Sequence, residues 1–540
     1  MNHSISFPGL TPSAVATPDR ASTKAYLVGG GIASLASAAF LIREGDLIGH
    51  NITILEELDT LGGSLDGSGS PEAGYVLRGG RMLESKYLCT FDLFSSIPAL
   101  TGKGSVTEEI FAWNNTMKTS SKSRLFRDGH RLASPAFGLS ERHILTIERL
   151  ALEPENLLGR STIADQFDAD FFKTDFWSMW CTTFAFQQWH SAVEFKRYLV
   201  RFAHMVSGFQ RLEGIMRTPL NQYDSMVRPL VKWLEQRGVK FQTKTRVTDL
   251  EFDDKTVKRI VFECDGAAGE LAVLPSDLVI VTLGSMTEAS SLGDMDNAPV
   301  LNTKVHGGAW TLWDKLAFDR PEFGNPGVFC DHIEESKWVS FTTTLHDQAF
   351  LNFVRDLTGN VPGEGGLITF SDSAWLASIV IPSQPHFVDQ PKDVSVFWGY
   401  GLKVDVPGDF VRKPMSECTG REIMTEIIGH LRLKAHGASL LSDAICIPCM
   451  MPFITSQFLP RQAGDRPQVI PEGYGNLAFT GQFCELPDDV VFTVEYSIRS
   501  AQTAVSRMLG LKHEPPAVYK GKYHPAVLYE AFKALHGIAA

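Results

Sequence analysis

The stretch KAYLVGGGIAS, residues 24–34, decides the fold of the N-terminal region. Residues 24–28 have the character of a short buried strand, three glycines follow at once, and residues 32–43 form an apolar, alanine-rich run typical of a helix. Residues 51–55 predict a second strand, and Glu56 follows at the spacing expected for an acid that binds ribose hydroxyls. This order predicts a βαβ unit that binds a dinucleotide.

Each residue of the glycine turn has its own predicted role. Gly29 and Gly31 permit a tight turn and a close approach of the backbone to the pyrophosphate. Ile32 and Ala33 begin the helix, whose first N–H groups and partial positive charge attract the phosphates. Ser34 stands where the usual motif has a third glycine, so the motif is imperfect.

A second glycine pair favours FAD over NAD as the dinucleotide. Gly62, Gly63 and Ser64 follow Glu56 closely, and flavoproteins commonly place such a pair against the diphosphate and the flavin. A simple turn is the alternative interpretation of these residues. We therefore expect FAD, and the glycine motif alone does not separate flavoprotein classes.

Composition narrows the class of protein. The chain has 540 residues, of which 44% are hydrophobic and 21% charged, so two or more lobes with substantial cores are expected. A formal net charge of −12 argues against nucleic acid as a partner. The eight cysteines have no disulfide-framework spacing, which suits the cytoplasm, and the single CxxC, at 446–449, lacks the second pair that a zinc ribbon needs. No metal site is expected.

The expected fold is α/β, with a Rossmann-like FAD-binding domain that is discontinuous in sequence. Further strands at 239–264, 277–282 and 477–481 lie far apart, with long insertions between them. An aromatic-rich run at 171–204 would serve either as helical core or as a pocket wall. The predicted segments are a loose N-terminal tail (1–23), three parts of the FAD-binding domain (24–125, 237–300 and 441–510), a helical substrate or lid region (126–236), a substrate-binding domain (301–440) and a C-terminal helical segment (511–540).

Six further blocks of sequence occur in order along the chain. They are GGSLDG (62–67), RGGR (78–81), FAF (184–186) with WHS (189–191), NQYDS (221–225), GSMT (284–287), and GQFCE (481–485) with PDD (487–489). With these blocks the chain, from about residue 24 to residue 504, resembles the oleate hydratases, formerly called myosin-cross-reactive antigens. The resemblance implies an FAD-dependent hydratase that adds water to the cis-9 double bond of oleate and yields 10-hydroxystearate. FAD would have a structural or electrostatic role rather than a redox role.

The resemblance implies roles for several residues near the reacting double bond. Tyr223, in the NQYDS block, is the expected proton donor, since the other tyrosine position often seen in this block is Leu220 here. Met82 is the main departure, because the family places a water-activating glutamate there and methionine accepts no proton. Either other groups hold the water, or Glu84 takes over, or the activity differs.

The remaining site residues are also expected from the resemblance. Arg461 would clamp the fatty acid carboxylate with two parallel hydrogen bonds, although an ion pair within the protein is an equal alternative. Glu485 and the 481–482 turn are expected at the isoalloxazine end of the flavin. The full set for the cofactor adds Arg81, Ser285 and Gly481, and the set for the substrate adds Gln222, Thr455 and Gln457.

Two other functions stay open from the sequence. One is a flavin oxidoreductase of the amine oxidase or desaturase type, which would share the N-terminal motif. The other is a non-catalytic, flavin-bound fatty acid carrier, which Met82 favours. The expected partner is a free unsaturated fatty acid, and the open questions include a peripheral membrane contact and whether the protein is a monomer or a homodimer.

Overall fold

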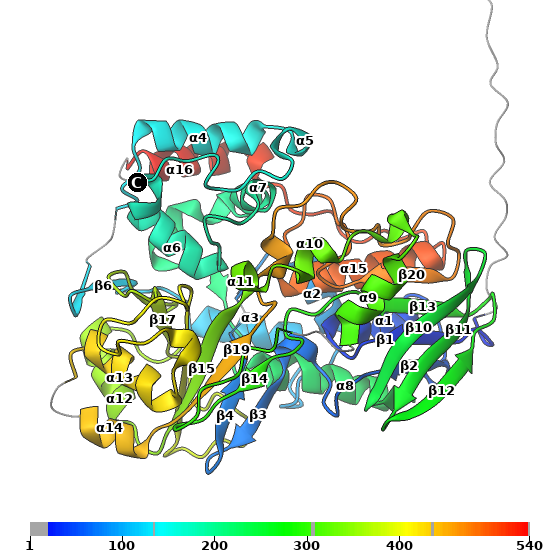
Figure 1. Ribbon diagram of the computed structural model, residues 1–540, viewed down its shortest axis with the longest axis horizontal. Helices are drawn as coiled ribbons and strands as arrows, with labels where there is room; N and C mark the ends of the chain where they lie inside the picture. Colours follow the sequence, from blue (N-terminus) through cyan, green and yellow to red (C-terminus); the bar gives the residue numbers. More distant parts are fainter. Residues whose placement is uncertain (1–19, 81, 133–135, 304–307, 434–436, 538–540) are drawn as a thin grey trace, which may run out of the picture.

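A computed structural model describes residues 20–80, 82–132, 136–303, 308–433 and 437–537 (Figure 1). Residues 1–19 of the predicted tail lie outside these ranges, whereas residues 20–23 form a turn that leads into the first strand. Within the described ranges, no helix combines the length and the apolar character needed to cross a membrane.

The Rossmann-like part is a five-stranded sheet in the order β20–β13–β1–β2–β9, in which every pair is parallel. Its middle strands are mostly apolar because both faces of the sheet are covered, and all four residues of β1 are buried. The strands come from three distant parts of the chain, which confirms the predicted α/β fold with a discontinuous Rossmann-like domain. They are β1 (Ala25–Val28), β2 (Ile52–Leu55), β9 (Lys240–Gln242), β13 (Leu278–Thr282) and β20 (Leu477–Thr480).

Helices α1 and α15 pack against each other beside this sheet (Figure 1). The predicted strand region 239–264 divides into two parts, because only β9 joins the parallel sheet and the rest forms a separate three-stranded antiparallel sheet. The helices of this part are α1 (Ile32–Arg43), α2 (Leu88–Ser95), α3 (Val106–Thr116), α8 (Arg228–Glu235), α9 (Gly308–Ala317) and α15 (Val494–Met508), and the small sheet has β10 (Thr245–Asp253), β11 (Thr256–Cys264) and β12 (Ala267–Ala272).

An eight-stranded sheet forms the second lobe, in the order β14–β19–β15–β18–β17–β16–β6–β7. It draws strands from outside the predicted substrate segment 301–440, since β6, β7, β14 and β19 all lie beyond those limits. Its strands are β6 (Leu125–Arg127), β7 (His130–Arg131), β14 (Ser291–Leu292), β15 (Trp338–Leu345), β16 (Ile368–Phe370), β17 (Ala377–Val380), β18 (Ser395–Gly401) and β19 (Ile445–Met451). Helices α12 (Ala349–Thr358), α13 (Gly420–His430) and α14 (Gly437–Asp443) belong to this lobe.

A hairpin joins this lobe to the Rossmann-like part. Strands β3 (Gly67–Ser70) and β4 (Gly74–Leu77) pair with each other, and β4 lies along β15. The backbone N–H groups of Tyr75 and Leu77 donate to the hydroxyls of Thr344 and Thr342, each at 2.9 Å. Two of the buried threonines of β15, Thr342 and Thr344, are therefore satisfied by the hairpin.

A helical lobe covers one side of the molecule and includes α4 and the C-terminal helix α16 (Figure 1). The aromatic residues of 171–204 mostly form its core, in which Trp180 stacks on Phe176 at 5.4 Å between ring centroids. Within its described part, residues 511–537, the predicted C-terminal helical segment is helical in η9 (Gly521–Tyr523) and α16 (Pro525–Leu535), which pack against η4. The other helices of the lobe are α4 (Glu141–Leu152), α5 (Glu155–Leu158), α6 (Asp175–Phe184), α7 (Ala192–Arg201) and η4 (Ala203–Arg211).

Candidate functional site

The glycine turn connects β1 to α1 in the conformation that close backbone approach requires. Gly29 has a φ of +96°, in the left-handed region that favours glycine. Gly31 is the N-cap of α1, where no side chain caps the first-turn N–H groups and no acidic residue occupies the first turn. Ile32 and Ala33 line a cavity at this point. The helix therefore presents free donors and its positive end to that cavity.

The second glycine pair lies directly against the turn. Gly62 N donates to Gly30 O at 2.9 Å, and a Cβ on Gly63 would lie 3.2 Å from the Cα of Gly31. Gly63 also has a φ of +57°. Glycine is needed here because of both the backbone conformation and the close approach.

Glu56 holds the turn from the end of β2. Its Oε2 accepts a hydrogen bond from Gly30 N, and its Oε1 accepts one from Leu58 N at 2.8 Å. Burial raises the pKa of Glu56, and the two backbone hydrogen bonds oppose this effect. The carboxylate lines the same cavity as the glycines.

This glycine-rich cavity has a volume of about 1430 Å³. Nine of the predicted cofactor residues line it: Gly29, Gly31, Ile32, Ala33, Glu56, Gly63, Ser64, Ser285 and Gly481.

Three other predicted cofactor residues lie elsewhere in the described structure, and Arg81 lies outside the described residues. Ser34 is fully buried and hydrogen-bonds to the Thr282 hydroxyl at 3.1 Å. Gly62 lies behind the cavity wall, and Glu485 belongs to a group of ion pairs.

Among the polar residues of the cavity wall that sequence reasoning missed are Arg78 and Glu288. Gln482, in the 481–482 turn expected near the flavin, also lines the cavity. Burial raises the pKa of Glu288 to about 7, although it accepts a hydrogen bond from Trp310 N at 3.2 Å. Arg78 and Gln482 belong to blocks that the sequence singled out, whereas Glu288 follows the GSMT block directly and carried no signal of its own.

Arg461 lies in a buried ionic cluster that we call the Glu194 cluster, formed by Glu194, Arg197, Arg461, Arg466 and Glu485. Arg461 Nε is 2.9 Å from Glu194 Oε1, and its Nη1 is 3.1 Å from Glu485 Oε2. Arg197 pairs with Glu485 at 2.8 Å. The predicted carboxylate clamp is thus paired within the protein, and Glu485 faces arginines rather than the glycine-rich cavity.

Thr455 and Gln457 are buried, and both lie a few positions before Arg461 of this cluster in the sequence. The Thr455 hydroxyl donates to Ser336 O at 2.9 Å, and Gln457 Nε2 donates to Ile454 O at 3.0 Å. Neither residue, nor Arg461, is among the described residues that line the glycine-rich cavity or the apolar cavity that lies next to it.

A second cavity, the apolar cavity, has a volume of about 1090 Å³. It lies between the helical lobe and the eight-stranded sheet, and its floor is Gly79 and Gly80. No lysine or arginine occurs among the described residues of its wall. The apolar and aromatic lining includes Met82, Leu83, Trp180, Phe184, Phe202, Met205, Val206, Phe209, Leu212, Ile215, Trp338, Leu367, Trp398 and Phe492.

The two cavities are neighbours. Arg78 lines the glycine-rich cavity and Gly79 lines the apolar one. On the other side, Gln482 of the glycine-rich cavity donates to Thr493 O at 2.9 Å, and Thr493 lines the apolar cavity. A molecule in one cavity therefore lies close to a molecule in the other.

Met82 and Glu84 both line the apolar cavity. Glu84 is therefore placed where it could take over the water-activating role that Met82 cannot perform. Strand β5 (Leu83–Glu84) pairs with β8 (Ile215–Met216) and fixes the Glu84 backbone. Glu84 Oε1 is 2.8 Å from Arg201 Nη1, and Oε2 is 3.5 Å from His204 Nε2. Burial would raise the pKa of Glu84, but His204 and Arg201 outweigh it and hold the pKa below its usual value. Glu84 is therefore an ionised group on an apolar wall.

Three tyrosines line the apolar cavity. The Tyr198 hydroxyl donates to Val491 O at 2.6 Å, and the Tyr400 hydroxyl donates to Thr182 O. The ring of Tyr87 lies 5.6 Å from the Arg201 guanidinium. Burial raises the pKa of Tyr87 well above its usual value, as does the charge of Glu84, so the hydroxyl stays protonated.

The structure places Tyr223 outside the described lining of the apolar cavity. Its ring packs on Gly62, where an added Cβ would lie 3.3 Å from Cδ2. Burial raises its pKa, and Arg228 opposes the shift. Its neighbour Gln222 lines a small pocket that shares Gly80 with the apolar cavity.

Comparison with known proteins identifies the relatives of this chain. An oleate hydratase from Streptococcus pyogenes serotype M49 (strain NZ131) is 40% identical over 528 residues, covering 95% of this chain and 89% of that protein. A linoleate hydratase from Lactiplantibacillus plantarum is 32% identical over 541 residues, covering 91% and 94%.

Solved structures share the fold at low sequence identity. Cyclohexylamine oxidase from Brevibacterium oxydans IH-35A has a TM-score of 0.53 at 12% identity and covers 90% of this chain and 99% of that one. Putrescine oxidase bound to putrescine has a TM-score of 0.51 at 11% identity, covering 90% and 99%. The family model described as MCRA matches residues 22–506. The chain therefore belongs to the MCRA family, the oleate hydratase family that its sequence blocks indicated.

Proposed function

We propose that this protein is an FAD-dependent fatty acid hydratase that adds water to the cis-9 double bond of oleate. The observation that carries the proposal is the contact between the two cavities, one glycine-rich and one apolar, at Arg78–Gly80 and at Gln482. A cavity walled mainly by aliphatic and aromatic side chains suits a fatty acyl chain. The hydratase relatives support the reaction.

The glycine-rich cavity fits FAD. The uncapped N-terminus of α1 supplies donors for the pyrophosphate, and the Gly31–Gly63 contact leaves backbone exposed on both sides of the turn. Glu56 would bind ribose hydroxyls, and Ser285 and Gly481 would contact the rest of the cofactor. The bound flavin would supply electrostatic stabilisation rather than electrons, because addition of water changes no net oxidation state.

Hydration of an isolated alkene needs a proton donor, stabilisation of positive charge on carbon, and a held water molecule. Glu84 meets the last two needs, because an ionised carboxylate accepts a hydrogen bond from water and attracts developing positive charge. Its low pKa makes it a weak base, which is sufficient against a carbocation-like centre. Met82 contributes only apolar contact.

The proton donor is a tyrosine in this proposal. Tyr223 is the candidate from the family block, and Tyr87 is the candidate from the geometry, because it lines the cavity beside Glu84. Tyr87→Phe and Tyr223→Phe distinguish them. The variant that removes the donor should lower kcat about 10²-fold or more with KM little changed, and the other should retain most activity.

The carboxylate of the fatty acid has a separate set of proposed partners. Thr455, Gln457 and Arg461 remain the candidates from the family block. Two of their buried polar atoms, Gln457 Oε1 and Arg461 Nη2, have no hydrogen-bond partner among the described residues. These atoms would have to turn toward the apolar cavity on binding, and Arg461→Gln should then raise KM for oleate more than it lowers kcat.

A peripheral membrane contact fits the C-terminal helix. Leu528, Tyr529 and Phe532 of α16 are 50%, 61% and 45% exposed. Fatty acids partition into bilayers, so a helix with exposed apolar groups would bring the protein to its substrate. A Leu528→Ser, Phe532→Ser double variant should bind oleate-loaded liposomes more weakly in co-sedimentation.

One incubation tests the main proposal. Purified protein with FAD and oleate in ¹⁸O-labelled water should give labelled 10-hydroxystearate by mass spectrometry, without consumption of oxygen or nicotinamide. Ketone or diene products would instead indicate an oxidoreductase. Unchanged oleate that co-purifies with the protein would indicate a carrier.

A further inference from the structure

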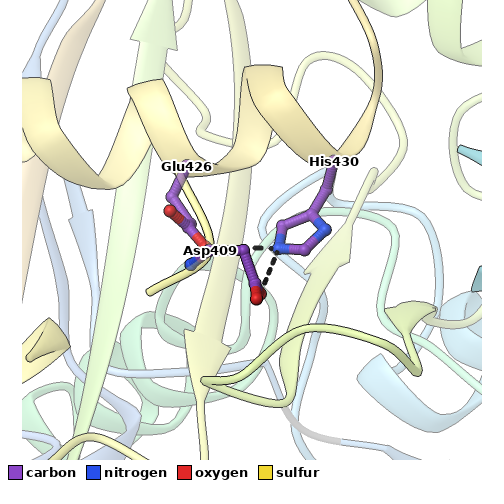
Figure 2. Close-up of side chains that lie close together, drawn as sticks. All are labelled: Asp409, Glu426 and His430. Atoms are coloured by element: carbon purple, nitrogen blue, oxygen red, sulfur yellow. Dashed lines mark hydrogen bonds and ion pairs between the residues drawn. The ribbon is translucent and has the colours of Figure 1, made fainter. Parts of the chain in front are cut away.

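A cluster of three potential metal ligands lies in the eight-stranded lobe, apart from both cavities. Glu426 and His430 are one turn apart on α13, and Asp409 comes from the loop before that helix. Figure 2 shows the imidazole directed at the two carboxylates. One donor atom from each residue lies within 4.8 Å of the others.

The distances in this cluster are too long for good hydrogen bonds. His430 Nε2 lies 3.3 Å from Glu426 Oε1 and 3.4 Å from Asp409 Oδ2. The His430 side chain is only 6% exposed, and its Nε2 has no hydrogen-bond partner in the described ranges. A charge-assisted N–H···O bond would be about 2.7–2.9 Å long. In contrast, metal–ligand bonds of about 2.0–2.1 Å in a tetrahedron place ligand atoms about 3.3–3.4 Å apart.

The carboxylates are held in place by backbone groups. Glu426 accepts hydrogen bonds from the N–H groups of Asp409 (2.7 Å), Phe410 (2.9 Å) and Val411 (2.7 Å). Asp409 Oδ2 accepts one from Ala374 N at 2.8 Å. Each donor oxygen keeps a lone pair for another partner. Such outer hydrogen bonds orient metal ligands in advance.

The aromatic surroundings fix the imidazole in the same way. The His430 ring stacks on Phe370, with centroids 5.2 Å apart, and meets the edge of Phe410 at 5.1 Å. The ring is therefore held with Nε2 facing the carboxylates.

The charge of the cluster also favours a cation. Within the described part of the chain, neither Asp409 nor Glu426 forms an ion pair with lysine or arginine. The Asp409 side chain is 41% exposed, so one side of the cluster is open to water. Two carboxylates that share a single imidazole as their ion-pair partner in the described structure are costly to hold together unless another positive charge is present.

We propose that Asp409, Glu426 and His430 bind a zinc ion, with water as the fourth ligand. Imidazole and carboxylate donors suit Zn²⁺, and His430 Nε2 lies at tetrahedral ligand spacing from one oxygen of each carboxylate. Mg²⁺ and Ca²⁺ instead take six or more oxygen ligands. The ion fastens the 409–411 loop to α13 and supports the fold of this lobe. Asp409 lies 17 positions before Glu426 and shares no motif with it (426 minus 409), so the chain carries no recognisable zinc pattern.

Metal binding by the full-length protein tests this proposal. After dialysis against a chelator, the protein should bind one Zn²⁺ per chain by equilibrium dialysis and elemental analysis. Asp409→Asn and His430→Gln should each weaken binding more than about 10-fold. Co²⁺ should give the intense visible bands of a tetrahedral site in the native protein and not in the variants.

A matched control uses another histidine–aspartate pair. His143 Nε2 lies 3.0 Å from Asp168 Oδ1, and no third potential ligand joins them among the residues that the structure describes, so His143→Gln should keep the Zn²⁺. Zn²⁺ should also raise the Tm of the native protein and leave that of Asp409→Asn unchanged. Absence of stoichiometric Zn²⁺, equal binding by His430→Gln, or an equal Tm rise in Asp409→Asn would overturn the proposal and favour a protonated His430 between the carboxylates.

Discussion

Replacement of Glu194 by glutamine tests how much the Glu194 cluster stabilises the fold. Glu194 lies on α7 and is fully buried. Its Oε1 is 2.9 Å from Arg461 Nε and 3.0 Å from Arg466 Nη1. Glutamine keeps the size of the side chain and removes its charge, so the arginines are left with too few anions.

The magnitude follows from the pKa of Glu194. Burial would raise this pKa, but the charges of Arg466, Arg461 and Arg197 outweigh it and lower the pKa to about 2. A shift of about 2.5 units from the usual value corresponds to about 3 kcal/mol. Breaking a buried ion pair typically costs a similar 3–5 kcal/mol. Over a chain of 540 residues this is a fall in Tm of about 3 °C.

Glu155→Gln is the matched control. Glu155 also pairs with Arg197, at 2.8 Å, but its side chain is 39% exposed. Exposed pairs contribute about 0–1 kcal/mol, so the control should lower Tm by less than about 1 °C. Thermal unfolding followed by circular dichroism compares the two. Equal shifts in both variants would refute the argument from burial.

The pH dependence supplies an independent check. The folded-state pKa of Glu194 is depressed, so its stabilisation is fully present above the unfolded-state value near 4.5. It is lost as the pH falls from there toward 2. The Tm difference between native protein and Glu194→Gln should be constant at neutral pH. It should shrink toward zero as the pH falls across that acid range. A difference that widens in acid would show the sign to be wrong.

Three further substitutions test other parts of the site. Gly63→Ala should weaken FAD binding more than about 10-fold by fluorescence titration, because its Cβ would lie 3.2 Å from the facing Cα, whereas Gly159→Ala, at a φ of +50° with nothing within 4 Å, should keep the affinity. Glu288→Gln should stabilise the cofactor-free protein by up to about 3 kcal/mol at pH 8 and not at pH 4. The reason is that a carboxyl pKa raised to about 7 in the folded protein costs stability only as the pH rises from 4.5 through 7. A gain in stability at pH 4 would contradict this. Glu84→Gln should slow oleate hydration about 10²-fold while Met82→Leu stays within about 3-fold, and the reverse order would remove Glu84 from the mechanism.

The sequence predicted the parts of the fold that are local. A strand, a glycine turn and a helix are contiguous at 24–43, so their order alone indicated the βαβ unit. The region 239–264 was harder, because alternating apolar residues occur in both the parallel and the antiparallel sheet. Strand β15 was missed because its threonines look solvent-exposed in sequence, whereas their hydroxyls bond to β4.

The same limit applies to the candidate site. The glycines and Glu56 were predicted because their roles depend on near neighbours, and all of them except Gly62 line one cavity in the structure. Arg461 was expected at a substrate carboxylate, yet Glu194, far away in sequence, is its buried partner. A charged side chain pairs with whichever opposite charge lies near it in the folded protein. A local sequence pattern does not show which distant residue that will be.

The order of strands in the parallel sheet has a consequence for biosynthesis. Strand β20, at 477–480, pairs with β13, and β13 in turn pairs with β1 near the start of the chain. At about 5–20 residues per second, a ribosome needs on the order of half a minute or more to reach β20. Strand β13 is complete about 195 residues before β20 begins (477 minus 282), so one edge of this apolar strand lacks its neighbour for about 10–40 s of that time. Until translation is almost complete, that edge is a site where another chain could pair and aggregate.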